Sequence, residues 1–409
     1  LGVREVRQGV VPGSVLARFE GSPADQELFR QGYYHVEGQA SQLAALCVDA
    51  QPGETVIDLC AAPGGKSSQL AAALGGWGLL VSNEYVPARA EVLKSNLERM
   101  GVANAVVLNE DTARIAAALP EFFDRVLVDA PCSGEGMFRK DPDARGEWSE
   151  GNVKQCAARQ DEILREAWRA LKPGGTLVYS TCTFNRDEDE GALERMAAWA
   201  GDEIAESEET AVEDAWGIAC GRVGAFRTFR FYPHRTCGEG FFAAVARKSF
   251  DAGGRVRAPK ARRTVFAAVD RKTAGELARW VRNPGGMRFA AVADTCYAWY
   301  AAQADAVRTL SEALPVIYSG VALGQVFKGV LKPDPALAFF DGLNRGALPA
   351  AELDDEETLR FLRRQDIAAG GLAEGMNLVC SRGRALGFAK RIGARVNNLY
   401  PNSLRIIKQ

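Results

Sequence analysis

Short apolar runs alternate with helix-length segments between about residues 53 and 248, and this alternation limits the fold more than any other feature of the chain. The runs rich in β-forming residues lie at 55–59, 79–83, 105–108, 125–128 and 176–180. Segments with apolar residues at helical spacing, such as 87–100 and 153–171, separate them. Strands and helices in this order predict an α/β fold with a doubly wound parallel sheet. Two later runs, 225–231 and 240–246, have no helix between them, so we expect an antiparallel pair at that edge.

The pattern changes after this region. Residues 251–264 are rich in Gly, Arg and Lys, which is typical of an interdomain linker. The weaker periodicity beyond the linker predicts two smaller α+β units, residues 265–325 and 326–409. Before it lie the sheet domain, residues 53–250, and an N-terminal lead-in segment, residues 1–52.

The composition is typical of a soluble globular protein, with 47% hydrophobic and 25% charged residues. No apolar run is long enough to span a bilayer and no signal peptide is visible, so we expect a cytoplasmic protein, by default a monomer. The first residue is Leu1 rather than Met, and we therefore expect that an N-terminal piece is missing. Nine cysteines without a CxxC pair, together with only two histidines, predict no metal site and fit a reducing compartment.

Charge is distributed unevenly along the chain. Residues 254–409 contain 24 Lys and Arg against 14 Asp and Glu, whereas residues 1–253 contain 26 against 38. A basic C-terminal part behind an acidic, enzyme-like part predicts that the tail binds a polyanion. The alternative is a solvated surface of uneven charge.

Two cysteines follow two of the predicted strands. Cys132 lies in the sequence VDAPCSG after the fourth strand, and Cys182 lies in YSTCTF at the end of the fifth. Neighbouring parallel strands end at the same edge of a sheet, so we expect the two thiols to face one cavity. This arrangement favours covalent catalysis over a structural disulfide, while simple packing of free cysteines is the alternative.

A glycine-containing loop, residues 58–66 (DLCAAPGGK), follows the first strand and opens a helix. The glycine pair allows a ligand to approach the backbone, and the start of the helix offers unpaired N–H groups. The spacing is neither that of a P-loop nor GxGxxG, so a nucleotide-like cofactor other than a dinucleotide is favoured. The alternative is a turn with no ligand.

Acidic residues follow the next three strands. Glu84 lies about 20 residues after the glycine loop, where a carboxylate can accept both hydroxyls of a ribose. Asp111 is placed to meet an adenine edge, and Asp129 ends the fourth strand. Each acid alone could be a helix N-cap, but their common position predicts a nucleoside site.

With these motifs, the chain is similar to bacterial members of the NOP/Sun family of RNA cytosine-5 methyltransferases, which use S-adenosylmethionine, and most similar to the branch that modifies small-subunit ribosomal RNA. The matching segments are 58–66, 83–84, 129–141, 147–149, 179–184, 238–242, 386–391 and 397–401. The similarity implies a Rossmann-like methyltransferase sheet and a C-terminal PUA-like RNA-binding extension. The family usually also has an N-terminal RNA-binding lobe; in this chain we expect that lobe to be truncated to residues 1–52 or absent.

The resemblance implies roles for individual residues. Cys182 would be the nucleophile, and Cys132 would assist release of the methylated product. The residues that would hold S-adenosylmethionine or lie next to it are Cys60, Ala61, Ala62, Pro63, Gly64, Gly65, Lys66, Glu84, Asp111 and Asp129.

The chemistry of such a reaction explains the need for a thiol. Carbon 5 of cytosine is too weak a nucleophile to take a methyl group directly, and addition of a thiolate at carbon 6 activates it. A free cysteine has a pKa of roughly 8.5, so positive surroundings have to lower it, and Lys66 is a candidate for that charge. Asp129 is a candidate for a hydrogen bond to the ring nitrogen.

Three alternatives remain open. In a DNA-type methylase, the thiol in the Pro-Cys context, Cys132, would be the nucleophile. The substrate could be transfer RNA instead of 16S ribosomal RNA. A cofactor-binding RNA scaffold without catalysis would use its thiols only for packing.

Overall fold

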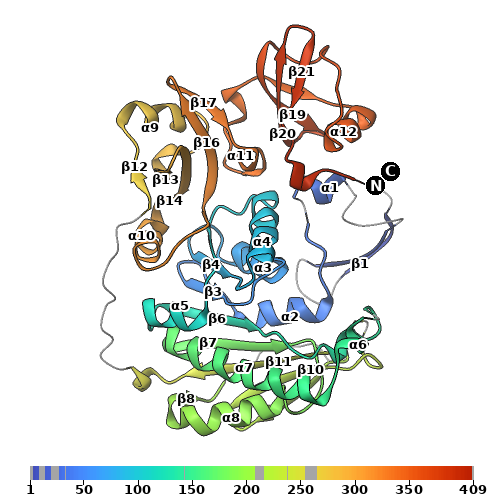
Figure 1. The fold of residues 1–409 in the computed structure, drawn as a ribbon, viewed down its shortest axis with the longest axis vertical. Coiled ribbons are helices and arrows are strands. Elements are labelled where there is room, and N and C mark those ends of the chain that lie inside the picture. Colours follow the sequence, from blue (N-terminus) through green and yellow to red (C-terminus); the bar gives the residue numbers. More distant parts are fainter. Residues whose placement is uncertain are drawn as a thin grey trace.

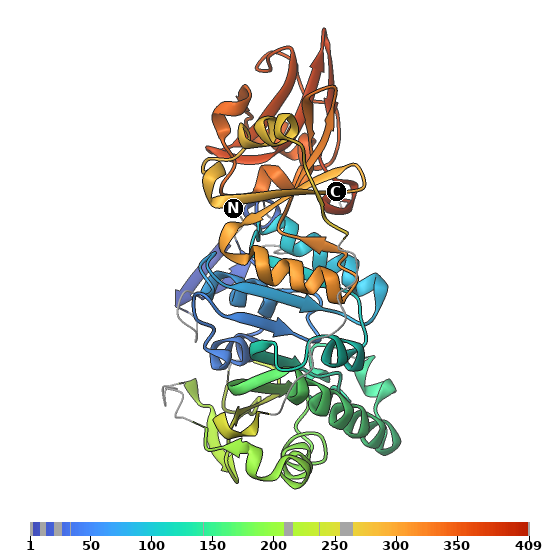
Figure 2. The same cartoon turned by 90° about the vertical axis from the view of Figure 1, so that its left-hand side faces the viewer.

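The computed structural model describes residues 3–8, 14–19, 27–32, 34–141, 143–207, 216–236, 238–253 and 265–407. From residue 254 onwards, the predicted linker lies outside the described residues. A large sheet domain forms one end of the molecule, and the two C-terminal sheets form the other end (Figures 1 and 2). No helix in the described part of the chain has the length and apolar character needed to cross a membrane.

The sheet domain contains five parallel strands in the order β5-β4-β3-β6-β7. They are β3 (Thr55–Asp58), β4 (Leu79–Asn83), β5 (Ala105–Leu108), β6 (Phe123–Asp129) and β7 (Leu171–Thr181). The chain leaves β3 for β4 on one side and later returns to β6 on the other. This reversal opens a crevice at the carboxyl ends of β3 and β6, where ligands of such sheets bind.

Beyond β7 the sheet continues with antiparallel strands, as the sequence predicts. β11 (Phe241–Lys248) pairs with β7, and β10 (Phe226–Phe231) pairs with β11. β9 (Ala219–Val223) forms the edge, and the two-residue β8 (Ile204–Ala205) pairs with the end of β11. The predicted fold class, a Rossmann-like sheet with an antiparallel edge, is confirmed.

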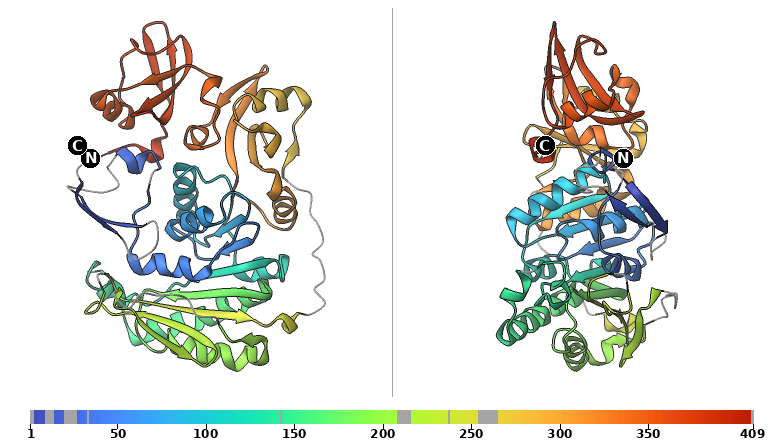
Figure 3. Two further views of the ribbon diagram at one scale, coloured as in Figure 1. Left: turned by 180° about the vertical axis from the view of Figure 1, so that it is seen from behind. Right: turned by 90° about the vertical axis from the view of Figure 1, so that its right-hand side faces the viewer.

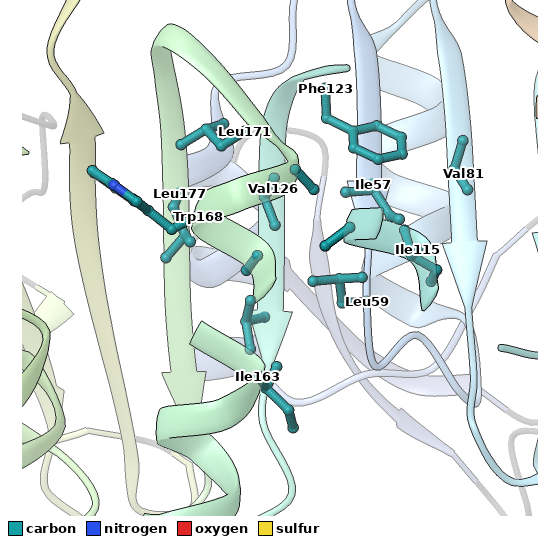
Figure 4. Packing of buried hydrophobic residues seen from close by; sticks show 14 of the residues in the cluster. Ile57, Leu59, Val81, Ile115, Phe123, Val126, Ile163, Trp168, Leu171 and Leu177 are labelled. Atoms are coloured by element: carbon teal, nitrogen blue, oxygen red, sulfur yellow. The ribbon is translucent and has the colours of Figure 1, made fainter. Parts of the chain in front are cut away.

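Helices cover both faces of this sheet. Their bounds are α2 (Gln39–Val48), α3 (Gly65–Ala73), α4 (Pro87–Arg99), α5 (Thr112–Ala118), α7 (Glu150–Ala170) and α8 (Glu190–Ala200). α5, α7 and α8 bury one face around Ile57, Phe123 and Leu177 (Figure 4). α2, α3 and α4 bury the other face, where Val56 packs. Val56 and Ile57 face opposite ways because successive residues of a strand alternate between the two faces.

The N-terminal segment consists of a hairpin, β1 (Val3–Gln8) with β2 (Val15–Phe19), and a short helix, α1 (Glu27–Arg30). Arg99, at the end of α4, is buried, and its guanidinium stacks on the Phe29 ring with 3.8 Å to the centroid. Arg30 Nη1 donates to the Leu404 carbonyl at 2.8 Å. The segment therefore contacts both the sheet domain and the C-terminal end of the chain (Figure 3).

The C-terminal part contains two sheets. The first has the order β12 (Ala267–Ala268), β13 (Met287–Val292), β14 (Thr295–Tyr300), β16 (Val321–Phe327) and β17 (Val330–Pro333), with α9 (Arg271–Ala278), α10 (Ala304–Ala313) and α11 (Pro335–Phe339). The second has the order β18 (Ala350–Glu352), β19 (Gly375–Ser381), β20 (Arg384–Ile392) and β21 (Arg395–Asn398), with α12 (Asp355–Leu362). β16 runs through residue 325, the position where the sequence places the boundary between the two C-terminal units.

The first C-terminal sheet is joined to the sheet domain by a strand that the sequence did not predict. β15 (Tyr318–Ser319) pairs antiparallel with β5 and so becomes the last strand of the large sheet. α10 adds Val307 and Leu310 to the same hydrophobic cluster as Ile57. The two parts therefore share one core.

Candidate functional site: two thiols and a cofactor loop

The two cysteines of the sequence motifs lie side by side at the carboxyl ends of β6 and β7. The Cys132 and Cys182 sulfur atoms are 3.2 Å apart, and both thiols are free. The strand ends are fixed to each other by a bond from the Ala130 N–H to the Ser180 carbonyl at 2.8 Å. A side chain at Gly136 would collide with the Cys182 carbonyl oxygen, so this close approach of the two loops requires glycine. The prediction that the two thiols lie at the ends of neighbouring strands is confirmed.

The thiol pair is chemically unequal. The two sulfur atoms share one hydrogen bond, and a bond that Cys132 donates lowers the pKa of Cys182, although burial opposes this effect. Nearby Lys66 also lowers the pKa of Cys182, and Asp129 raises it. The same hydrogen bond, followed by burial, raises the pKa of Cys132. Cys182 is therefore the thiol that ionises more readily.

Lys66 and Asp129 form an ion pair beside the thiols. The Lys66 ammonium lies 2.8 Å from Asp129 Oδ2, and Asp129 Oδ1 accepts a hydrogen bond from the Ser180 hydroxyl at 2.7 Å. A second carboxylate, Glu37, lies 3.4 Å from the Lys66 ammonium. Burial alone would lower the pKa of Lys66, but Asp129 and Glu37 raise it, so Lys66 stays charged. Glu37 was not found from the sequence, because it lies before α2 and outside every motif.

The predicted cofactor loop connects β3 to α3. Gly64 has φ 110°, a left-handed conformation that glycine adopts without strain, and its carbonyl begins the helix by accepting the Ser68 N–H at 2.9 Å. Asp58, the last residue of β3 and the first of the loop, is buried; its Oδ2 accepts a hydrogen bond from the Ser67 hydroxyl at 2.8 Å. Its other carboxylate oxygen, Oδ1, has no hydrogen-bond partner in the described part of the protein. Burial raises the pKa of Asp58 to about 7.

Asp58 Oδ1, unpaired among the described residues, suits a cofactor group that donates a hydrogen bond or carries a positive charge, and the start of α3 suits a carboxylate. The two features together fit a cofactor that has both kinds of group. Leaving such an oxygen without a partner costs roughly 1–3 kcal/mol, and an ammonium or hydroxyl donor removes that cost. The N–H groups at the start of α3 suit a carboxylate. S-adenosylmethionine has an amino group, a sulfonium and a carboxylate, so the residues present fit this group.

The acids at the strand ends lie where the sequence places them. Glu84 follows β4 and is buried; one oxygen accepts the Val86 N–H at 2.9 Å, and the other lies 3.5 Å from Arg89 Nη2. Asp111 follows β5, but it is exposed and caps α5 by accepting the Ala113 N–H at 2.8 Å. The sequence leaves two interpretations of these acids, a helix N-cap and a nucleoside site. Asp111 does act as a helix N-cap. A cofactor contact of Asp111 remains a prediction.

A buried carboxylate behind the thiols, Glu188, was also not found from the sequence. Its Oε2 accepts the Ser133 N–H at 3.0 Å and the Gln160 side-chain amide at 2.7 Å, while Oε1 accepts the Asn185 amide at 2.7 Å. Glu188 thus ties the loop after Cys132 to the loop after Cys182. Its signal in the sequence is the acidic run 187–190 shortly after the second cysteine, a run that usually indicates a solvated helix start.

A second carboxylate, Glu135, also joins these two loops. It belongs to the loop after Cys132, whereas Glu188 follows Cys182. Its Oε2 accepts the Thr183 hydroxyl at 2.9 Å, and its Oε1 accepts the Trp148 ring N–H at 2.9 Å. Together, Glu188 and Glu135 hold the loops in a position where the thiols are in contact.

Replacement of Glu188 by glutamine should lower the free energy of unfolding by about 1–3 kcal/mol. The new amide nitrogen would face one of the N–H groups that now donate to Glu188, and that N–H group would lose its acceptor. Urea denaturation measures this change. The control is Glu194→Gln, which removes only a surface ion pair with Arg186 and should change stability by less than about 0.5 kcal/mol. Equal stability of the two variants would show that the Glu188 network does not hold the loops.

The sheet order, the glycine loop that opens a helix and the acids at the strand ends define the class of protein: an S-adenosylmethionine-dependent methyltransferase. Residues 45–247 match the family described as 16S rRNA methyltransferase RsmB/F, and residues 349–406 match the RsmF PUA domain. The chain belongs to this RsmB/F family.

Known relatives agree with this assignment. A ribosomal RNA small subunit methyltransferase F from Klebsiella pneumoniae is 34% identical over 396 residues, which cover 91% of this chain and 78% of the relative. The protein of the same name from Vibrio campbellii is 31% identical over 389 residues, covering 91% and 79%. The crystal structure of NSun6 from Pyrococcus horikoshii with SFG, an S-adenosylmethionine analogue, has a TM-score of 0.50 and 28% identity, and the match covers 56% of each chain. S-adenosylmethionine is thus the cofactor, as the sequence predicts.

Proposed function

We propose that this methyltransferase transfers a methyl group to carbon 5 of a cytosine in 16S ribosomal RNA through a covalent bond between Cys182 and carbon 6. The observation that carries the proposal is the contact of two free thiols at 3.2 Å, and the lowered pKa of Cys182 beside the raised pKa of Cys132 supports the assignment of their roles. The names of the relatives supply the ribosomal RNA target. The match to a PUA domain over residues 349–406 supports RNA as the partner.

The first step uses the acidity of Cys182. Its thiolate adds to carbon 6 of the cytosine, and the electron pair moves onto carbon 5, which becomes nucleophilic. Bound S-adenosylmethionine supplies an electrophilic methyl group. Lys66, next to the thiols, favours the charged form of Cys182 before the attack. In its protonated form, the carboxyl of Asp129, positioned beside Lys66 and Ser180, donates a hydrogen bond to the ring nitrogen and stabilises the negative charge that develops there.

Release of the methylated RNA requires that the bond between Cys182 and carbon 6 is broken again. A base removes the proton from carbon 5, the bond between Cys182 and carbon 6 breaks, and its electron pair returns to the Cys182 sulfur. The Cys132 thiol, 3.2 Å away and held in its protonated form by a raised pKa, donates a hydrogen bond to the returning thiolate. Cys132 thus assists release while Cys182 attacks.

The cofactor lies along the carboxyl ends of β3, β4 and β5 in this proposal. Glu84 would bind the ribose hydroxyls and Asp111 the adenine edge. The backbone of the loop that opens α3 would surround the amino-acid part, with residues Cys60, Ala61, Ala62, Pro63, Gly64 and Gly65.

The test is methylation of RNA by the purified protein. We expect methyl label from S-adenosylmethionine to enter 16S ribosomal RNA from cells that lack this enzyme, and bisulfite sequencing to show new 5-methylcytosine there. Label that enters only transfer RNA would contradict the target. Label in 16S ribosomal RNA without protection from bisulfite would contradict the carbon-5 chemistry.

A further inference from the structure

A pocket of about 660 Å³ lies where three parts of the chain meet. Gln31 of the N-terminal segment and Met100, at the end of α4, form one side. The opposite side comes from the two C-terminal units and carries three arginines, Arg282, Arg345 and Arg384. In Figure 1 this is the region where α1, α4, α11 and β20 converge. The pocket is not part of the site at the carboxyl ends of β3 and β6.

The three arginines come from distant segments but are brought together by backbone contacts. The Arg282 N–H donates to the Gly342 carbonyl at 2.8 Å, which places residue 282 against the segment that leads to Arg345. Arg345 Nη1 in turn donates to the Gly383 carbonyl at 2.7 Å, next to Arg384. A guanidinium held by a carbonyl oxygen keeps its charge and further N–H donors.

The charge of the pocket is positive. Among the described residues that line it, the only acid is Asp341, whose carboxylate lies 3.4 Å from Arg282 Nη2 and is fully exposed. All three arginines are exposed to solvent. Three guanidinium groups against one carboxylate attract an anion, and the planar fork of arginine matches the two oxygens of a phosphate.

We propose that this pocket binds the phosphodiester backbone of the RNA substrate at the point where it passes between the C-terminal units and the sheet domain. The inference rests on the proposed function in one respect, that the substrate is RNA. The pocket volume lies in the range of roughly 300–1,000 Å³ typical of small-molecule sites, so a nucleotide with its phosphate fits. The charged lining favours a nucleic acid over an apolar protein segment.

The position of the pocket gives this contact a second effect. Gln31 Nε2 donates to the Ser381 carbonyl at 3.3 Å, which links the N-terminal segment to β19. Gly32, also in the lining, cannot carry a side chain, because a Cβ atom would collide with the Arg99 carbonyl oxygen. RNA bound here contacts all three parts at once and stabilises their arrangement.

The experiment compares a triple variant, Arg282→Gln with Arg345→Gln and Arg384→Gln, with the wild-type chain. The probe is a fluorescein-labelled fragment of 16S ribosomal RNA, and fluorescence anisotropy gives the dissociation constant over a range of KCl concentrations without cofactor. We expect binding by the triple variant to be weaker by roughly tenfold or more. We also expect the slope of log affinity against log salt to fall by roughly 0.7 for each phosphate that the variant no longer neutralises.

The matched control is Arg308→Gln on α10, an exposed arginine with a surface ion pair to Asp305. It should leave both quantities unchanged. A second triple variant with lysine at the same three positions keeps the charge and should recover most of the affinity. If the glutamine triple variant binds RNA with wild-type affinity and slope, the proposal is wrong. The same holds if the lysine variant, shown to be folded by circular dichroism, binds no better than the glutamine variant.

Two other outcomes distinguish this proposal from a protein-binding role of the pocket and from the proposed carbon-5 chemistry. If the glutamine variant binds the free RNA normally but no longer binds intact small ribosomal subunits, the pocket contacts a protein and the RNA assignment fails. Because binding is measured without methyl transfer, failure of the carbon-5 chemistry would leave the result unaffected. Conversely, normal RNA binding by the variant would not affect the role of Cys182.

Discussion

Replacement of Cys182 by alanine should reduce methyl transfer by about 10⁴-fold or more, because in the proposed mechanism covalent activation of the cytosine has no substitute once the attacking thiolate is gone. Cys132 lies 3.2 Å away, but its pKa is raised, so it does not take over as a nucleophile. The measurement is the rate of label transfer from S-adenosylmethionine to 16S ribosomal RNA. Binding of RNA and of the cofactor should remain close to wild type.

The control for this variant is Cys220→Ala, which removes an exposed thiol on β9 and should leave the rate unchanged. The rival mechanism, in which Cys132 attacks, makes the opposite prediction. It requires Cys182→Ala to retain formation of a covalent complex with RNA. Such a complex would overturn the assignment of the two thiols.

Replacement of Cys132 by alanine should instead trap the enzyme on its substrate. The departing Cys182 sulfur would lose its hydrogen-bond donor, and removal of one donor from a developing charge typically costs about 10²–10³ in rate. We therefore expect multiple turnover to fall by about that factor while a covalent complex of protein and RNA accumulates. The complex is measured as a band that resists denaturation on a gel.

The same variant should form the complex more slowly at neutral pH than at high pH. The hydrogen bond from Cys132 is the main cause that lowers the pKa of Cys182, so its loss raises that pKa and leaves less thiolate at neutral pH. Raising the pH restores the thiolate. The double variant with Cys182→Ala is the control and should form no complex. Absence of the band in Cys132→Ala at every pH would contradict a role for Cys132 in release.

Those parts of the fold that depend on local pattern were predictable from the sequence. β4 and β5 have the bounds that the apolar runs indicate, and the antiparallel pair β10 and β11 follows from the missing helix between two runs. The contact of Cys132 with Cys182 was also predictable, because it needs only two neighbouring strands and their carboxyl ends. Topology alone brings these residues together.

Features that depend on side-chain packing between distant segments were not predictable. Glu37 reaches Lys66 across 29 positions, and Glu188 reaches the Ser133 N–H across 55. Neither acid has a periodic or motif context that separates it from a solvated surface acid. For Asp111, the position after a strand was predicted correctly. The structure adds that its side chain caps α5 by accepting the Ala113 N–H.

The addition of β15 to the edge of the large sheet has a consequence for how this protein can be divided. β5 would otherwise present a row of unpaired N–H and C=O groups, and such open edges tend to pair with other chains and aggregate. The strand that covers this edge is encoded more than 200 positions later, beyond the linker. A fragment that ends at the linker would therefore lose a protective strand together with the two C-terminal units. The catalytic unit is complete only when most of the chain has been synthesised.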